Sequence, residues 1–208
     1  MSYEKLYFEL KEAYENLSVD CFRGDILKVV DKLKDLYLLE TAKTNNQSKA
    51  FKDVMKLLSV ETCKRRPILQ KAIIKENKQI FTNSYILFIL NNHILNIPTH
   101  DDENMINGYP QIDNIMPECN NEITLNVKEL KNDLLIHKKD ESYTIITSNK
   151  KTLSFDPNNL LYCISILNIN DTITIQYKER NDSDQITSTM KIKNDNGTCI
   201  IVAMRLNN

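Results

Sequence analysis

Residues 152–167 read TLSFDPNNLLYCISIL, and this stretch decides the fold because it joins a strand to a helix. The strand is short and alternates apolar with polar residues, as expected when one face is buried. Asp156 stands at the helix N-cap, and Pro157 follows at the first helical position, where its missing N–H costs nothing. Leucine and isoleucine residues then recur at helical spacing and predict a buried helix face. Nothing in the stretch is reactive, so it predicts a structural unit.

The same strand-to-helix unit occurs earlier, at residues 122–135, which read EITLNVKELKNDLL. Asn126 is the expected N-cap, and Glu129 stands three residues later at capping-box spacing. After the second unit, three more strands are predicted within DTITIQYK, QITSTMKIK and TCIIVAMRL. The second half of the chain is therefore predicted to run strand-helix-strand-strand-strand.

Residues 47–90 predict one helix followed by three strands. Ser48 is the expected helix cap, and the apolar residues expected to face inward recur at helical spacing: Phe51, Val54, Met55 and Leu58. The apolar period then changes from 3.6 to 2 within ILQKAIIKE, KQIFTNS and YILFILN. Residues 96–121 are polar and acidic and contain three prolines, which predicts a connector without strands.

Residues 1–45 predict a hairpin of two amphipathic helices. The first helix carries an apolar stripe, namely Tyr3, Tyr7, Leu10, Tyr14 and Leu17. Asp25 is the expected cap of the second helix, and KTNNQS is the expected linker to the rest of the chain. The stripe has two interpretations, packing within the same chain or binding to a second copy or a partner. We therefore expect a helical hairpin over 1–45 and one α+β domain over 46–208.

The composition is typical of a soluble globular protein, with 41% hydrophobic and 26% charged residues in 208. No apolar run approaches the roughly 18–20 residues that span a bilayer. The N-terminal sequence carries charges where a signal peptide is apolar, so a cytoplasmic location without membrane attachment is expected. The five cysteines are widely spaced without a CxxC pair, which favours reduced structural thiols. The three glycines exclude a glycine-rich phosphate loop.

The net charge of −1 hides two oppositely charged segments. Residues 47–75 contain eight lysines or arginines and two acids, whereas residues 76–126 contain one lysine and seven acids. A basic segment of this kind is typical of a surface that faces a polyanion, although solvated helix faces are often basic as well.

Several of these stretches resemble the bacterial DNA sliding clamp, the beta subunit of DNA polymerase III. LSFDPNNLLYCISILN through the terminal IIVAMRL is similar to the last half-domain of that family. GYPQIDNIMP resembles the family's connector between domains, and QIFTNSYILF stands where the family has a strand ending in T-D-G-H-R-L. The resemblance covers residues 47–208. It implies an α+β fold of strand-helix-strand-strand-strand half-domains, with mainly antiparallel sheets and the helices on one side.

The sequence also departs from the family pattern. Thr82 matches, but NSYI at residues 83–86 replaces the family's D-G-H-R, and Ala203 replaces a proline. The spacer between Leu87 and Tyr109 is too short for a complete domain, and residues 1–45 have no counterpart in the family.

The resemblance implies a helix face turned toward double-stranded DNA, which clamps contact without sequence preference. Lys49, Lys52 and Lys56 share one face of the helix that begins at Ser48, opposite its apolar residues. The full set of residues expected to face DNA is Lys49, Lys52, Lys56, Lys64, Arg65, Arg66, Lys128 and Lys131. An ordinary solvated helix face is the competing interpretation.

The resemblance also implies an apolar pocket that takes a short partner peptide bearing leucine and phenylalanine. The matching positions are Thr82, Asn83, Ser84, Tyr85, Leu87, Met204, Arg205 and Leu206. Methionine and leucine form an adaptable apolar floor, and Arg205 can hold a peptide carboxylate or carbonyl. The alternative is that Met204 and Leu206 belong to the core side of an edge strand.

Three functions fit the sequence. The first is a clamp-like processivity factor of DNA replication, from a phage or mobile element, that forms homo-oligomers and tethers replication or host proteins at DNA. The second is a clamp-fold interaction module that binds or imitates a host protein surface without encircling DNA. An enzyme is the least favoured, because no catalytic arrangement stands out and His93 and His100 lack the rigid spacing of metal ligands. No metal or cofactor is predicted.

Overall fold

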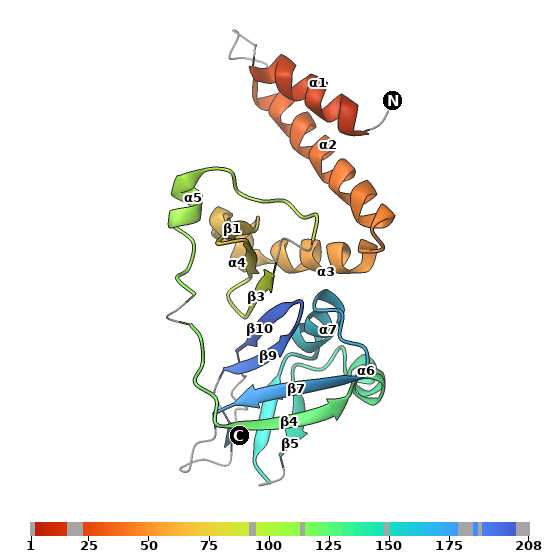
Figure 1. The fold of residues 1–208 in the computed structure, drawn as a ribbon, viewed down its shortest axis with the longest axis vertical. Coiled ribbons are helices and arrows are strands. Elements are labelled where there is room, and N and C mark those ends of the chain that lie inside the picture. Colours follow the sequence, from red (N-terminus) through yellow and green to blue (C-terminus); the bar gives the residue numbers. More distant parts are fainter. Residues whose placement is uncertain are drawn as a thin grey trace.

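The computed structural model describes residues 3–15, 23–91, 95–112, 115–147, 150–178, 185–186 and 189–202. Figure 1 shows a helical hairpin at the N-terminal end and, below it, a body in which helices cover one side of a large twisted sheet. The expected mixture of helices and antiparallel strands, preceded by a helical hairpin, is confirmed.

The large sheet is antiparallel throughout, with the order β1-β2-β3-β10-β9-β7-β4. Its strands are β1 (Ile73–Lys75), β2 (Lys78–Thr82), β3 (Ile86–Asn91), β4 (Asn121–Asn126), β7 (Thr172–Tyr177), β9 (Met190–Asn194) and β10 (Gly197–Ile201). The pairing of β3 with β10 joins the first and second halves of the body into one sheet. In this register Phe88 lies between Phe81 and Cys199, and the two phenylalanine rings stack with centroids 5.0 Å apart. The last described strand, β10, therefore lies beside β3, although the two strands are far apart in the sequence.

Three helices cover one face of this sheet, namely α3 (Ser48–Leu58), α6 (Val127–Ile136) and α7 (Pro157–Ile166). The helix α7 lies between the other two and contacts both, as Figure 1 shows. Its caps are as predicted, because the Asp156 carboxylate accepts the Asn158 N–H at 2.8 Å and Pro157 is the first helical residue. Asn126 caps α6 in the same way, accepting the Lys128 and Glu129 amides.

The cap predicted for α3 is wrong. Its N-cap is Gln47, Ser48 is already helical, and no side chain caps this end. The preceding helix extends to Thr44, so the connection consists of Asn45, Asn46 and Gln47 only and is shorter than the predicted linker. Asn46 makes the tight turn with a positive φ of 58°, a conformation that asparagine tolerates better than most residues.

Two predicted strands are broken in the structure. The first, at residues 68–76, contains the 3-10 helix Pro67–Leu69 and only the short β1, preceded by α4 (Glu61–Arg65). The second, at residues 185–193, is divided between β8 (Gln185–Ile186) and β9. β8 pairs in parallel with β6 (Thr152–Phe155), and β6 pairs antiparallel with β5 (Tyr143–Ile146), which gives a separate three-stranded sheet.

The predicted connector contains one short helix, α5 (Glu103–Asn107), capped by the Asp102 carboxylate. Before β4 begins at Asn121, the described residues of the connector form no strand apart from an isolated bridge between Ala72 and Thr99. Beyond α5, Tyr109 is buried in a small apolar cluster with Leu69, Leu87 and residues of the sheet. This aromatic anchor fixes the connector to the sheet face that α3, α6 and α7 leave uncovered.

The N-terminal hairpin consists of α1 (Tyr3–Glu15) and α2 (Arg23–Thr44). Tyr7 packs against Val30 and Leu33, with Leu10 at the edge, so the middle of the apolar stripe is covered within the chain, whereas Tyr3 is exposed. Asp25 is not the helix cap, because α2 begins two residues earlier. Leu17 lies outside the described residues. Whether the hairpin and the body are separate domains stays a prediction.

Three of the five cysteines, Cys63, Cys163 and Cys199, are buried as free thiols, and Cys119 is half-buried. Cys21 lies outside the described residues. Among the described helices, none is both long enough and apolar enough to cross a membrane.

Candidate functional site

The turn between β2 and β3 builds one wall of an apolar hollow. Asn83 is buried, and its side-chain oxygen accepts the N–H groups of Tyr85 and Ile86, both at 3.0 Å. The Thr82 hydroxyl accepts the Ser84 N–H at 3.0 Å and donates to the Ile86 carbonyl at 2.8 Å. Ser84 has a φ of 78°, which these bonds hold in place. The turn is therefore rigid and presents Tyr85, 55% exposed, to solvent.

The end of β10 builds the opposite wall. Leu87 and Ile200 are paired in the β3–β10 ladder, and the Val202 N–H donates to the Tyr85 carbonyl at 2.9 Å. The resulting hollow, here called the turn hollow, has a volume of about 220 Å³. Its lining is Arg66, Thr82, Ser84, Tyr85, Ile86, Leu87, Pro110, Ile115, Ile200 and Val202.

Four residues of the predicted peptide pocket line the turn hollow, namely Thr82, Ser84, Tyr85 and Leu87. Asn83 lies beneath and holds the turn, so its contribution is structural support. Met204, Arg205 and Leu206 lie outside the described residues. Their place in the pocket stays a prediction.

Sequence reasoning missed five lining residues: Ile86, Pro110, Ile115, Ile200 and Val202. All of them lie inside the stretches that carry the clamp resemblance, but the sequence did not show that their side chains face the same hollow. Arg66, predicted to face DNA, also lines the turn hollow and supplies its only positive charge among the described lining residues.

Tyr109 supports the turn hollow from below. Its buried hydroxyl accepts the Thr82 N–H at 3.1 Å, at the last residue of β2. Burial raises the pKa of this phenol above its ordinary value of 10.0, and the Thr82 hydrogen bond opposes the shift only in part. The phenol is therefore neutral at physiological pH and serves as a hydrogen-bond acceptor for the strand end.

The predicted DNA-facing lysines of α3 lie on one exposed face of that helix. Lys49, Lys52 and Lys56 are all exposed, while Phe51 and Val54 on the other side are buried in the main core. Lys128 on α6 is exposed as well. The structure thus places these amines on the layer of helices that covers the sheet.

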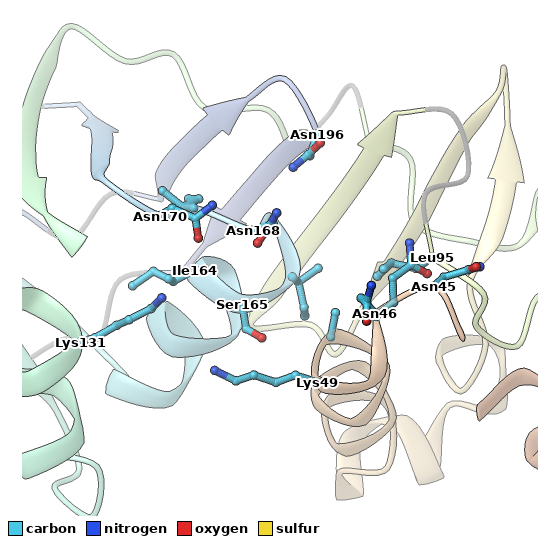
Figure 2. Close-up of a pocket in the computed structure, with 14 residues that line it drawn as sticks. Asn45, Asn46, Lys49, Leu95, Lys131, Ile164, Ser165, Asn168, Asn170 and Asn196 are labelled. Atoms are coloured by element: carbon cyan, nitrogen blue, oxygen red, sulfur yellow. The ribbon is translucent and has the colours of Figure 1, made fainter. Parts of the chain in front are cut away.

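Lys49 also meets Lys131, which extends from α6. Figure 2 shows the two side chains extending from different helices toward each other, with the end of α7 beside them. They line a second hollow of about 520 Å³ between α3 and α7, here called the lysine hollow. Burial lowers the pKa of the half-buried Lys131 ammonium, and the charge of Lys49 lowers it further.

The remaining predicted DNA-facing residues have different surroundings. Lys64 and Arg65 on α4 both pair with Glu61, at 3.9 and 3.4 Å. These pairs are exposed and contribute little to stability, but they place a negative charge among the basic groups. Lys64 and Arg65 thus have Glu61 as their neighbour, and Arg66 lines the turn hollow.

The described residues hold no cluster of three histidine, cysteine or carboxylate side chains able to bind a metal ion. His100 hydrogen-bonds through Nε2 with the Ile68 carbonyl at 2.9 Å, which gives it a structural contact. His93 lies outside the described residues.

No protein-family model and no curated protein matches this sequence. Solved structures, in contrast, match by fold: the described architecture is that of a sliding clamp. Bacterial beta subunits of DNA polymerase III are among the matching proteins. The Borrelia burgdorferi subunit, solved with a natural product, is 15% identical with a TM-score of 0.52. The Helicobacter pylori clamp, solved with a DNA ligase peptide, is 10% identical with a TM-score of 0.55.

The Streptococcus pyogenes subunit matches as well, at 14% identity and a TM-score of 0.50. Each of these three matches covers 76% of this chain and 63% of the other. The chain therefore spans less than two thirds of the length of the clamps it matches. At these identities the likeness establishes the fold, and it confirms the resemblance inferred from the sequence.

Proposed function

We propose that this chain is a clamp-like, non-catalytic accessory protein of DNA replication that holds partner proteins at double-stranded DNA. One observation carries the proposal: the β2–β3 turn and the end of β10 form an apolar hollow where the clamp resemblance expects a peptide pocket. The solved Helicobacter pylori clamp, with the same fold, binds a DNA ligase peptide. A cytoplasmic location follows from this role.

The chemistry of the turn hollow fits a short partner peptide. Leu87 and Ile200 form an apolar floor, and Tyr85 and Val202 form partly exposed walls, suited to leucine and phenylalanine side chains. Arg66 at the rim can hold a peptide carboxylate or carbonyl group. The lysines of α3 and α6 support the second half of the proposal, which is contact with the DNA backbone.

A fluorescent peptide carrying leucine and phenylalanine tests the pocket by anisotropy. Val202 lines the hollow and is 47% exposed, so Val202→Glu tests it without burying a charge in the core. We expect about tenfold weaker binding or more, because a carboxylate opposes apolar side chains docked beside it. Ile146→Glu is the matched control, since Ile146 is 69% exposed and lies outside the hollow. Equal binding by the parent and Val202→Glu would refute the proposed pocket.

The second candidate is the interaction module that occupies or imitates a host surface without encircling DNA. It is favoured by the turn hollow itself, because the described residues that line it come from one chain and require no ring. Under the first candidate the protein is a homo-oligomer on DNA. Under the second it binds peptides equally well but has no requirement for self-association.

A further inference from the structure

The lysine hollow lies where two helix ends meet. One wall is the start of α3, with Gln47, Lys49 and Ala50, and the other is the end of α7 together with the turn after it, from Ile164 to Ile169. Asparagines form much of its rim, and Figure 2 shows Asn168, Asn170 and Asn196 on the side away from Lys49. The volume of about 520 Å³ lies within the range of small-molecule sites.

Two positive charges share this hollow without a carboxylate among its lining residues. Neither Lys49 nor Lys131 forms an ion pair within the part of the chain that the structure describes. Two ammonium groups repel each other at close range, and half-burial of Lys131 adds a desolvation cost. An anion between them would remove both penalties.

The start of α3 adds neutral donors to the same wall. No acidic residue stands in its first turn, and no side chain caps it. The amides of Ser48, Lys49 and Ala50 have no acceptor within the described residues. Free amides and the helix dipole make such an end favourable for anions. α3 has 11 residues, long enough for this effect to develop.

The end of α7 would oppose an anion if its carbonyls were free, but most of them are already bonded. The Ile164 carbonyl accepts the Ile169 N–H at 3.0 Å, and the Leu167 carbonyl accepts side-chain amides of Asn194 and Asn196, both at 2.8 Å. The Ser165 hydroxyl oxygen is buried in this wall and has no hydrogen-bond partner among the described residues. It is one more donor available to a ligand.

From this geometry we propose that the lysine hollow binds a phosphate group, held between Lys49 and Lys131 against the start of α3. Tetrahedral phosphate oxygens accept several charge-assisted hydrogen bonds at once, which suits converging ammonium and amide donors. The phosphate has two sources, a DNA backbone or a free phosphate-bearing small molecule. Only the DNA source rests on the proposed function, whereas the site itself does not.

Inorganic pyrophosphate is the probe, titrated calorimetrically into the full chain. Removal of one charge-assisted hydrogen bond in Lys49→Gln or Lys131→Gln should raise the dissociation constant about tenfold. Lys75→Gln is the control, because Lys75 is an exposed lysine on β1, outside the hollow. It should bind pyrophosphate like the parent.

A competition with a labelled DNA duplex separates the two sources. Displacement of the duplex by pyrophosphate, together with weaker DNA binding by both variants, assigns the phosphate to DNA. If pyrophosphate binds without affecting DNA binding, or binds to a protein that has no affinity for DNA, the phosphate comes from a small molecule. The inference then stands even when the DNA role fails. Absence of pyrophosphate binding by the parent at millimolar concentration, or unchanged binding by both variants, overturns the inference.

Discussion

At the scale of single residues, Tyr109 connects the segment after α5 to the turn hollow. The family resemblance placed this tyrosine in a connector motif but gave it no partner. In the structure its buried hydroxyl accepts the N–H of Thr82, which lines the hollow. One aromatic residue thus fixes both the path of the connector and the end of β2.

Replacing Tyr109 with phenylalanine should therefore destabilise the fold. The change leaves the buried Thr82 N–H without an acceptor, which costs about 1–3 kcal/mol of unfolding free energy. Urea unfolding followed by circular dichroism measures the loss. Tyr3→Phe is the control, because the Tyr3 side chain is 44% exposed. Equal stability of the parent and Tyr109→Phe would contradict the assignment.

The raised pKa of Tyr109 gives the same variant a second readout. Unfolding returns the phenol to its ordinary pKa of 10.0, so the folded state holds the proton more tightly than the unfolded state. This stabilisation is complete below pH 10 and is lost as the pH rises through 10 toward the raised value. The unfolding free energy of Tyr109→Phe should therefore fall less steeply above pH 10 than that of the parent.

At the scale of helices and strands, the sequence predicted those features that depend only on neighbouring residues, such as two of the helix caps. Asn126 and Asp156 were predictable caps because their side chains bond amides two or three residues away. The cap at Ser48 failed because α2 continues almost directly into α3, and the turn at Asn46 left Gln47 in the cap position. The strand predicted from residue 68 failed because Pro67 starts a 3-10 helix there.

The candidate sites were predictable only in part, for a related reason. The resemblance identified the β2–β3 turn, but Ile200 and Val202 join it through the pairing of β3 with β10, which is not visible in local sequence. The meeting of Lys49 with Lys131 likewise depends on how α3 and α6 pack around α7. The spacing of the lysines in the sequence shows which of them share a face of one helix. Which lysines of different helices lie close together depends on tertiary packing.

The lysines on the layer of helices α3, α6 and α7 allow a separate test of the proposed contact with the DNA backbone. Changing Lys49, Lys52 and Lys56 together to glutamate should weaken binding of unrelated duplexes equally, because backbone contacts carry no sequence preference. The slope of log K against log salt should decrease by up to about 0.9 for each phosphate that the protein no longer neutralises. Anisotropy over a salt series measures both effects.

A triple variant with the same charge change controls for net charge. Lys32, Lys75 and Lys78 are exposed and lie outside α3, α6 and α7, so their change to glutamate should have a smaller effect. Equal weakening in the two triple variants would return Lys49, Lys52 and Lys56 to an ordinary solvated face.

At the scale of the whole molecule, the proposed encircling role depends on assembly. The chain spans 63% of the clamps it matches, and the first candidate function is that of a homo-oligomer on DNA. The sequence suggested the stripe of α1 as a surface for self-association. In the structure Tyr7 and Leu10 pack against α2 instead, which leaves less of that stripe for a second copy. An interface in the body or on the remaining hairpin surface is then needed.

Light scattering after size exclusion tests the encircling role directly. If the chain encircles DNA as a homo-oligomer, the measured mass at tens of micromolar should be at least twice the mass of one chain. On dilution, the mass should fall to that of the single chain only at low concentration. A stable ring has interfaces of roughly 1,200–2,000 Å² each, and these hold the copies together at higher concentration. A strict monomer at tens of micromolar would remove the encircling model. The turn hollow would then remain as the functional site of a clamp-fold interaction module, since its described lining comes from a single chain.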